Sequence, residues 1–367
     1  MKFQKYYLLI LVFFSFNALF AQKSDSTKLI RDSKLFGLPL VFFTPETGWG
    51  GGVAGGFSFL MHGEPETGRR SQIQFDFAYT QRNQLLLFFP FKLYWNNSVD
   101  QAYGEIGFFN FSDRFYPIGN EFDEAEQQER EETYRYNYPR IRLNYLKRVN
   151  KKNYFGLRYW FDDLAITETE AGGILAEENL SGSRGGIITG FGLIYQFDTR
   201  DHINYPTKGT FFEAVVWASE KWMGSDFRHQ RVYLDYRRYI TLKGKHILAL
   251  NGYVRLNYGD VPFDDLALFG GSKRMRGYFE GFYRDNHMIV AQAEYRFPIH
   301  KRFSGVAFTS FGEVIDKLSN LNTEYIRPSA GVGLRFKLIP KDKLNLRVDF
   351  GVGRNTSGFY LTVNEAF

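Results

Sequence analysis

Cysteine is missing from this 367-residue chain, and long apolar segments are missing from all of it except the N-terminal end. The lack of cysteine excludes a disulfide framework, a thiolate metal site and a cysteine nucleophile. After residue 21 no apolar run reaches the roughly 18 residues that a membrane-spanning helix needs. The six histidines form no HExxH pair, and no GxSxG motif accompanies them. We therefore expect no enzyme, no cofactor and no metal site.

The N-terminal end has the order of a targeting signal. Two lysines precede an apolar run, which ends at the small residue Ala21. This order is typical of a secretory signal peptide. A membrane-anchoring helix is the alternative, but the run is too short for one and contains Asn17. We predict a cleaved signal peptide at 1–21 and a short periplasmic N-terminal segment at 22–37.

The composition is rich in aromatic residues and in glycine. Phe, Trp and Tyr make up 19% of the chain, and there are 36 glycines. Aromatic side chains suit pleated sheets, and glycine permits strands to bend. The formal net charge of +6 is small and spread along the chain, so nucleic acid is not an expected partner. A soluble exported β protein or a membrane β-barrel remains.

Strict alternation of apolar and polar residues separates these two classes. It is clearest in residues 72–79, 288–299 and 344–352, where one face is apolar and aromatic and the other carries amides and charges. A soluble sandwich would alternate too, but its strands average only about five or six residues. Strands of about ten residues with a charged second face fit a wall between lipid and a wet lumen.

Sixteen segments of this kind follow one another between residues 38 and 367. The three longest links, near 113–132, 168–184 and 259–285, all follow odd-numbered segments, whereas most links after even-numbered segments are short. Outer-membrane barrels have short periplasmic turns and long extracellular loops. We predict an all-β transmembrane antiparallel β-barrel of sixteen strands over 38–367, with both ends periplasmic and an integral place in the bacterial outer membrane.

Several short motifs resemble a known family. They are Phe269-Gly-Gly-Ser-Lys-Arg-Met-Arg276-Gly277-Tyr278, Ala293-Glu294-Tyr295-Arg296-Phe297-Pro298, Phe197-Asp198-Thr-Arg200-Asp201 with Pro206-Thr-Lys-Gly209, Ile326-Arg-Pro-Ser-Ala-Gly331-Val-Gly333 and Pro45-Glu-Thr-Gly48. Together they resemble the BamA/TamA-type family of outer-membrane assembly and translocation barrels, also described as bacterial surface antigens. The motifs are spread over the predicted barrel and fall on the segments where the family would place them.

The resemblance implies that the sixth extracellular loop folds into the lumen, with Arg276, Gly277 and Tyr278 at its tip. A guanidinium confined there needs a carboxylate or aromatic partner. Glu294 and Asp349 have the inward parity to serve, and Glu294 is preferred. On the residues alone, Arg276 on a solvated loop is the simpler interpretation.

One departure from the family pattern bears on that partner set. Where the family has an aspartate in its thirteenth strand, before a glycine, this chain reads Phe308-Thr-Ser310-Phe-Gly312.

The resemblance implies two further sets of residues. Asp198, Arg200 and Asp201 with Pro206 and Gly209 look like the family's periplasmic turn motif. The last segment, with Gly358, Leu361, Val363 and Phe367, looks like the C-terminal signal by which outer-membrane substrates are recognised. A terminal strand of this kind can also pair with an exposed sheet edge.

The functional prediction follows from the resemblance. Too few residues lie between Gln22 and Gly37 for a periplasmic POTRA domain, so we expect a barrel-only member. It would assist insertion or translocation of proteins or lipids through a weak seam, because Pro39 and Pro45 remove hydrogen-bond donors from the first strand. The alternative is a passive or plugged pore, or an accessory subunit of an outer-membrane complex. An outer-membrane hydrolase ranks last. Outer-membrane lipid, lipopolysaccharide and other outer-membrane or periplasmic proteins are the expected partners.

Overall fold

The structure is a computed structural model that describes residues 30–44, 48–177, 179–340 and 342–367. The predicted signal peptide and residues 22–29 lie outside the described residues. The remainder of the predicted periplasmic segment, residues 30–37, forms the beginning of the first strand. The division into signal peptide, N-terminal segment and barrel stays a prediction.

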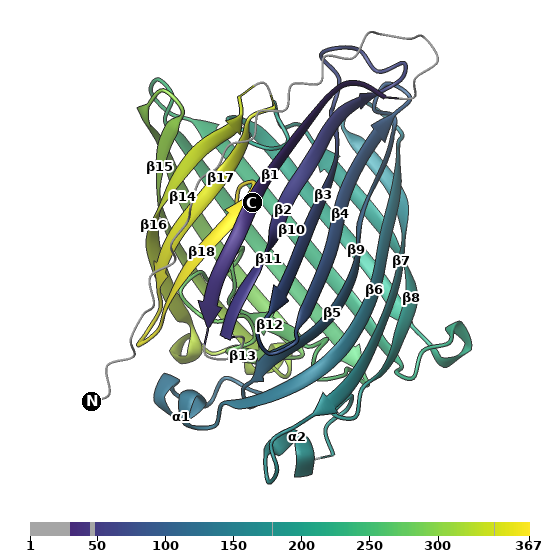
Figure 1. Ribbon diagram of the computed structural model, residues 1–367, viewed down its shortest axis with the longest axis vertical. Coiled ribbons are helices and arrows are strands. Elements are labelled where there is room, and N and C mark those ends of the chain that lie inside the picture. The colour runs from purple at the N-terminus through teal and green to yellow at the C-terminus, as the bar shows by residue number, and fades with distance from the viewer. Residues whose placement is uncertain (1–29, 45–47, 178, 341) are drawn as a thin grey trace.

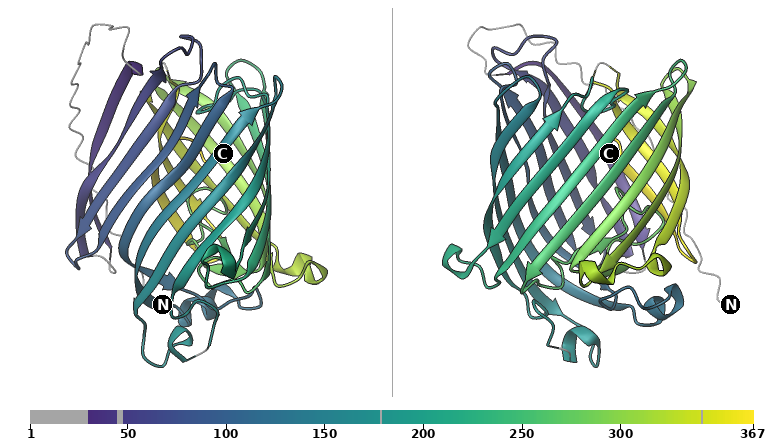
Figure 2. Two further views of the ribbon diagram at one scale, coloured as in Figure 1. Left: turned by 90° about the vertical axis from the view of Figure 1, so that its right-hand side faces the viewer. Right: turned by 180° about the vertical axis from the view of Figure 1, so that it is seen from behind.

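Sixteen strands form one antiparallel sheet whose spatial order follows the sequence. The sheet is rolled into a barrel, as Figures 1 and 2 show. Its strands are β1 (Ile30–Thr44), β2 (Gly48–Met61), β3 (Ser71–Thr80), β4 (Leu85–Trp95), β5 (Asp100–Phe115), β6 (Glu132–Arg148), β7 (Asn153–Glu168), β8 (Gly186–Asp198), β9 (Gly209–Ser219), β10 (His229–Thr241), β11 (Ile247–Gly259), β14 (His287–His300), β15 (Phe303–Ile315), β16 (Arg327–Ile339), β17 (Leu344–Val352) and β18 (Ser357–Val363). The predicted all-β class and the sixteen-stranded sheet are confirmed.

The remaining elements are short and lie in the loops. They are α1 (Glu124–Glu129), α2 (Ile174–Glu177), the 3-10 turns η1 (Lys221–Met223), η2 (Leu318–Asn320) and η3 (Thr323–Tyr325), and the paired strands β12 (Ala267–Phe269) and β13 (Tyr283–Asp285). In the described part of the chain, no helix is long and apolar enough to cross a membrane.

The three longest links leave the same end of the barrel. Figure 1 shows α1, α2 and the β12–β13 pair together at the bottom, and we call this end the loop end. The opposite end, which carries the four-residue turn between β6 and β7 at residues 149–152, is called the turn end. Loop length therefore sorts by strand parity, as the sequence predicted.

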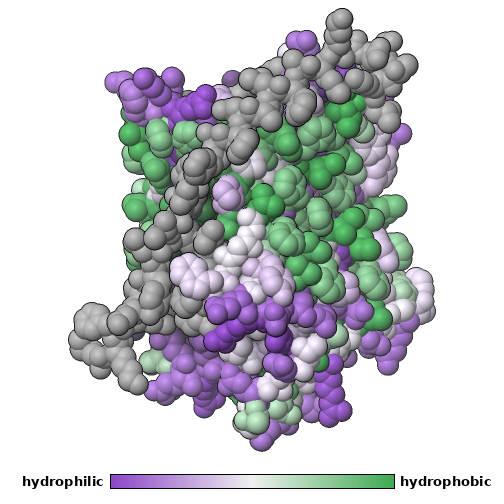
Figure 3. Space-filling view, in the orientation of Figure 1, coloured by the Kyte–Doolittle hydropathy of each residue, from purple (hydrophilic) through white to green (hydrophobic). Residues whose placement is uncertain are grey.

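The outward faces of the strands carry the apolar residues. On β7 and β8, Leu157 and Leu193 are 61% and 67% exposed, whereas the inward Arg158 is 3% exposed. Figure 3 shows the resulting hydrophobic belt between hydrophilic zones at both ends. An apolar band of this kind is the surface that a transmembrane barrel presents to lipid.

The lumen is packed most densely toward the loop end. Tyr116 and Phe263 of the long loops are buried there in two clusters with wall side chains, which include Phe115 at the end of β5. A third cluster around Trp217 lines the wall from β6 to β9 and includes Phe227 of the following link. The loop end of the barrel is therefore filled by its own loops.

The first strand differs from its prediction. β1 begins at Ile30, eight residues earlier than the predicted start at 38, and pairs with β2 as far as Met61. The pairing is irregular between Arg31 and Lys34, which masks the alternation in the sequence. The long β2 leaves backbone donors and acceptors that residues 30–37 satisfy.

Candidate functional site

The link between β11 and β14, residues 260–286, folds back into the barrel. Phe269, Met275 and Tyr278 of this loop are fully buried, and they pack in one cluster with the wall residue Val290. Figure 1 shows β12 and β13 within the outline of the barrel near the loop end. The sixth loop therefore occupies the lumen, as predicted.

Arg276 lies at the tip of this loop and is completely buried. Its Nη1 donates to Asp349 Oδ2 at 2.6 Å, and its Nη2 donates to Glu294 Oε2 at 2.8 Å. The structure thus brings Arg276 to both carboxylates that strand parity singled out, although we preferred Glu294 alone. One guanidinium joins the loop to β14 and to β17.

The ring of Phe308 covers the guanidinium of Arg276, with Cζ 3.5 Å from the ring centroid. This is the residue that stands in the segment where the family pattern has an aspartate. A cation over an aromatic face is stabilised by the ring quadrupole. The hydroxyl of the neighbouring Ser310 donates to Gln292 Oε1 at 3.1 Å. The ring of Phe308 and the carboxylates of Glu294 and Asp349 therefore surround the positive charge.

Four residues that the sequence analysis missed extend this ion network. Arg296 Nε donates to Glu294 Oε1 at 2.7 Å, and Arg335 Nε donates to Glu365 Oε2 at 2.8 Å. Arg347 Nη1 lies 3.6 Å from Asp349 Oδ2. The four missed residues are Arg296, Arg335, Arg347 and Glu365. Inward parity marks Arg296 and Arg347, which lie two positions from the predicted carboxylates.

The two other tip residues hold the loop to the last strands. Gly277 adopts φ 122°, and an added Cβ would lie 2.5 Å from the carbonyl carbon of Val352. Its N–H donates to Tyr360 Oη at 2.9 Å, while the Tyr278 hydroxyl donates to the Pro328 carbonyl at 3.0 Å. Both the close approach of the Val352 backbone and the positive φ at position 277 require glycine.

The predicted turn motif forms a compact structure between β8 and β9. Arg200 Nε donates to Asp198 Oδ1 at 3.0 Å, and Asp201 Oδ1 accepts the backbone N–H of Thr207 at 2.8 Å. Although burial opposes it, hydrogen bonding by Thr207 and Lys208 lowers the pKa of Asp201.

The rest of the motif sets the backbone of this turn. Gly209 takes φ 109° where β9 begins, and Pro206 is buried. The structure therefore gives the five motif residues a turn-forming position.

The seam is the line along which β1 faces β18. The sheet order starts with β1 and ends with β18, and no ladder pairing joins the two in the described residues. Figure 1 shows the two strands side by side. A cavity of about 910 Å³ is lined from both sides of the seam, by Leu38 and Leu40 of β1 and by Leu361 of β18. We call this cavity the seam chamber.

The C-terminal strand is shorter than predicted. Gly358, Leu361 and Val363 pair with β17, but the strand ends at Val363 rather than at Phe367. Asn364 adopts φ 75° and turns the last residues into the lumen.

The prediction that Phe367 closes the strand is therefore wrong. Continued alternation would place Glu365 on the face of Phe359, which is 56% exposed, and a carboxylate facing lipid is unfavourable. In the lumen Glu365 pairs with Arg335, and the Phe367 carbonyl accepts from Arg296 Nη2 at 3.0 Å.

A polar clasp bridges the seam at the turn end. Asp342, in the turn between β16 and β17, accepts a hydrogen bond from Ser58 Oγ of β2 at 2.7 Å. Arg70 Nε, before β3, lies 3.0 Å from Asp342 Oδ1. The side chain of Asp342 is 1% exposed, so its charge depends on these partners. Ser58, Arg70 and Asp342 thus link the beginning of the sheet to its end without a strand ladder.

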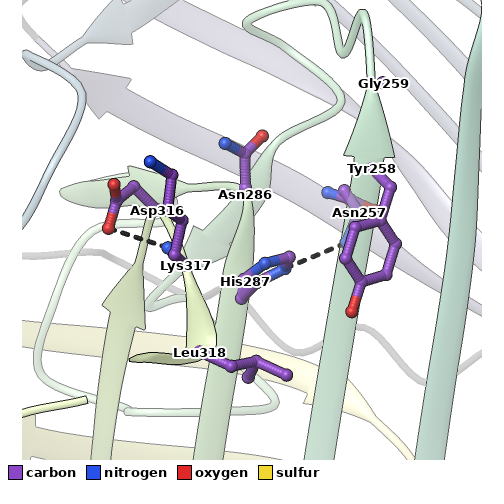
Figure 4. A pocket seen from close by; sticks show the side chains of 8 residues that line it. All are labelled: Asn257, Tyr258, Gly259, Asn286, His287, Asp316, Lys317 and Leu318. Atoms are coloured by element: carbon purple, nitrogen blue, oxygen red, sulfur yellow. Dashed lines mark hydrogen bonds between the residues drawn. The ribbon is translucent and has the colours of Figure 1, made fainter. Parts of the chain in front are cut away.

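A second cavity lies at the rim of the loop end and is shown in Figure 4. It measures about 270 Å³, which is below the roughly 300–1,000 Å³ typical of ligand sites. His287 Nδ1 accepts from the backbone N–H of Asn257, and Asp316 Oδ1 accepts from that of Lys317. In the part of the chain that the structure describes, no group of three or more His, Cys, Asp or Glu side chains is placed to hold a metal ion. The loop tip and the seam are the better candidates.

Comparisons with known proteins agree with this geometry. The Omp85 superfamily domain matches residues 66–367. BamA from Haemophilus ducreyi, solved without POTRA domains 1–3, is similar in fold, with a TM-score of 0.55 and 14% identity over 90% of this chain and 70% of that chain. CdiB from Acinetobacter baumannii has a TM-score of 0.52 and 12% identity over 91% of this chain and 60% of that chain.

The limits of these matches also matter. No curated protein matches the sequence. This chain spans less than two thirds of the CdiB chain, and at such low identity the two solved structures show the fold alone. The family match covers most of the chain, and so the chain belongs to the Omp85 superfamily of outer-membrane β-barrels.

Proposed function

We propose that this barrel assists insertion or translocation of proteins at the outer membrane by opening between β1 and β18. The observation that carries the proposal is the seam: in the described residues no ladder hydrogen bonds join these two strands. An unpaired strand edge is a template for an incoming strand. Membership of the Omp85 superfamily supports a role in protein insertion or translocation in general.

Three features of the seam support opening rather than permanent closure. Pro39 lies within β1 and has no N–H for a ladder. The turn at Asn364 directs the last residues of the chain away from the edge of β18. The clasp at Asp342 holds the turn end by side chains instead, and such contacts can break without disrupting a strand. We propose that the clasp closes the seam in the resting barrel.

A cross-linking experiment tests the proposal. Leu40 and Thr362 line the seam chamber from β1 and β18, so Leu40→Cys and Thr362→Cys, joined by a short bifunctional thiol reagent, should lock the seam. Neighbouring registers are tested in parallel. The matched control is Leu250→Cys with Ala293→Cys, which joins the already paired β11 and β14. The chain has no native cysteine to interfere.

The readout is the folding rate of a small outer-membrane barrel added unfolded to liposomes that contain the purified protein. We expect the unmodified protein and the cross-linked control to accelerate folding, and the seam-locked protein to lose the effect. Asp342→Asn, which removes the charge from the clasp, should raise the rate further. Equal rates with locked and unlocked seams would refute opening at this position.

A plugged barrel is the second candidate function, because the loop end is filled. Tyr278 and Phe282 are buried in one aromatic cluster and Phe263 in another, all within the lumen. A passive pore needs an open water path, whereas these loops obstruct it. Single-channel recordings in planar bilayers test this alternative. Steady conductance with no effect on client folding would favour a pore over the insertion role.

A further inference from the structure

The seam chamber has an apolar wall where barrel lumens are ordinarily polar. Leu38 and Leu40 of β1 and Leu86 and Phe88 of β4 line it. On β2 the lining residue Ala54 is small, which leaves room between these strands. Inward residues of transmembrane barrels usually face water and are polar. Gln72, Gln74 and Asp76 of β3 lie between the apolar residues of β1 and those of β4, so the apolar lining forms two strips, on β1 and on β4, and each strip suits hydrocarbon better than water.

The rest of the chamber carries positive charge. Lys92 of β4 and Lys273 of the sixth loop both line it, and both side chains are exposed to its space. Arg274 and Arg347 line it as well. Within the described residues, neither lysine has a carboxylate at ion-pair distance. Arg200, Arg237 and Lys273 repel the charge of Lys92, which Glu213 attracts from a longer distance. Arg274 and Arg237 repel the charge of Lys273, and Glu105 and Glu280 offset part of this repulsion.

The carboxylates that line the chamber are largely neutralised by other partners. Glu105 lies 2.9 Å from Arg140 Nη1, and Asp235 lies 2.5 Å from Arg237 Nη2. Glu213 accepts hydrogen bonds from the Tyr103 hydroxyl at 2.6 Å and from Tyr233, and it lies 4.0 Å from Arg158 Nη2. Glu365, which also lines the chamber, lies 2.8 Å from Arg335 Nε. Asp76 of β3 is the exception, since it lines the chamber with no ion pair in the described structure. Two lysines without counterions thus face one such carboxylate.

An uncompensated cation in a confined space is unfavourable. Desolvation inside the lumen and the guanidinium of Arg274 lower the pKa of Lys273, although Glu105 and Glu280 oppose this shift. A bound anion would relieve this repulsion, and phosphate oxygens accept several charge-assisted hydrogen bonds from lysine and arginine. The chamber's volume of about 910 Å³ lies within the range of ligand sites.

We propose that the seam chamber binds an anionic glycerophospholipid from the surrounding membrane. Its phosphate lies between Lys92 and Lys273, and its acyl chains lie along the apolar wall of β1 and β4. The chains reach the bilayer through the seam, where no ladder closes the wall in the described residues. Charge complementarity selects an anionic headgroup, and the apolar wall selects a lipid over a free anion. The proposal is independent of the insertion role and is tested without a client protein.

The test measures lipid binding to the purified full chain in an uncharged maltoside detergent. Ala54→Cys, at a lining position of the cysteine-free chain, carries a small environment-sensitive fluorophore. Diheptanoyl phosphatidylglycerol is titrated, with diheptanoyl phosphatidylcholine and inorganic phosphate as comparison ligands. We expect saturable binding of the phosphatidylglycerol, at least about tenfold tighter than that of the phosphatidylcholine, and no saturation by inorganic phosphate.

Substitutions that should weaken phosphatidylglycerol binding, and one that should strengthen it, test whether the lipid occupies the seam chamber. Lys92→Gln with Lys273→Gln should weaken phosphatidylglycerol binding by about tenfold or more, whereas Asp76→Asn should strengthen it because it removes a like charge. Lys151→Gln with Lys152→Gln, on the exposed turn between β6 and β7, is the matched control and should change nothing. If a semi-native gel shows that the double lysine variant is not folded, the binding affinity of Asp76→Asn still tests whether the lipid occupies the seam chamber.

Three outcomes would overturn the proposal. Equal binding of the two lipids would show that the lysines do not select charge. Saturation by inorganic phosphate at the same concentrations would show a free-anion site rather than a lipid site. Unchanged phosphatidylglycerol binding in Asp76→Asn and in the folded lysine variant would place the lipid elsewhere.

Discussion

Replacing Arg276 with alanine should lower the heat resistance of the folded barrel. The side chain is fully buried and bonds to Glu294 at 2.8 Å and to Asp349 at 2.6 Å. Removing one partner of a buried ion pair costs about 3–5 kcal/mol, because the other charge stays buried. Here Glu294 keeps Arg296, and Asp349 keeps Arg335. We therefore expect the free energy of unfolding to fall by about 3 kcal/mol, at the lower end of this range.

The assay is the temperature at which the folded band disappears on a semi-native gel. Arg276→Lys keeps the charge but cannot bond to both carboxylates as the guanidinium does. Its unfolding temperature should therefore lie between those of the wild type and Arg276→Ala. Arg228→Ala is the matched control, because Arg228 is 72% exposed in its pair with Glu220 and such a pair contributes about 0–1 kcal/mol. If Arg276→Ala shifts the temperature no more than Arg228→Ala does, the buried network does not stabilise the barrel.

The remaining predictions concern the tip, the turn and the C-terminal tail. Gly277→Ala should destabilise the folded barrel by about 1–3 kcal/mol, since its φ is 122°, whereas Gly252→Ala, with open space around it, should have little effect on the same gel. Asp201→Ala should destabilise the barrel at neutral pH, and the difference from wild type should vanish as pH falls. The folded pKa of Asp201 is lowered, so its contribution is complete above the unfolded value of about 3.9 and is lost as pH falls through the folded value; urea unfolding at pH 7 and below 4 checks this. Glu365→Gln should lower heat resistance and increase cleavage of the tail by carboxypeptidase, because the tail loses its ion pair.

Local patterns made the fold predictable, and they also pointed to part of the site. Alternation and loop length identified sixteen strands, and inward parity singled out Glu294 and Asp349. Parity says which face a residue occupies but not which residues of distant strands meet there. The contact of Arg335 with Asp349 depends on the register of β16 against β17, in which Gly333 is opposite Asp349.

The ends of the chain were the least predictable part. Ile30 begins β1 because a long partner strand is available, and the tail leaves β18 because Glu365 finds Arg335 in the lumen. Both causes are tertiary contacts, which local patterns do not record. The apolar inner wall around Leu86 and Phe88 was not predicted, for a related reason. A strand that is apolar on both faces shows no alternation, so the sequence does not say which residues face the lumen.

The clasp between Ser58 and Asp342 has a consequence for the order of folding. These two residues are 284 positions apart, whereas each strand of the large sheet pairs with the next one along it. Hairpins between successive strands close short loops and form early, while a contact across nearly the whole chain carries the largest loop-closure entropy. The rim at the turn end therefore closes last. A sheet whose final strands have not yet paired holds its early hairpins but leaves Arg70 and Ser58 without Asp342, so the turn-end rim is sealed only after the C-terminal strands have joined the sheet.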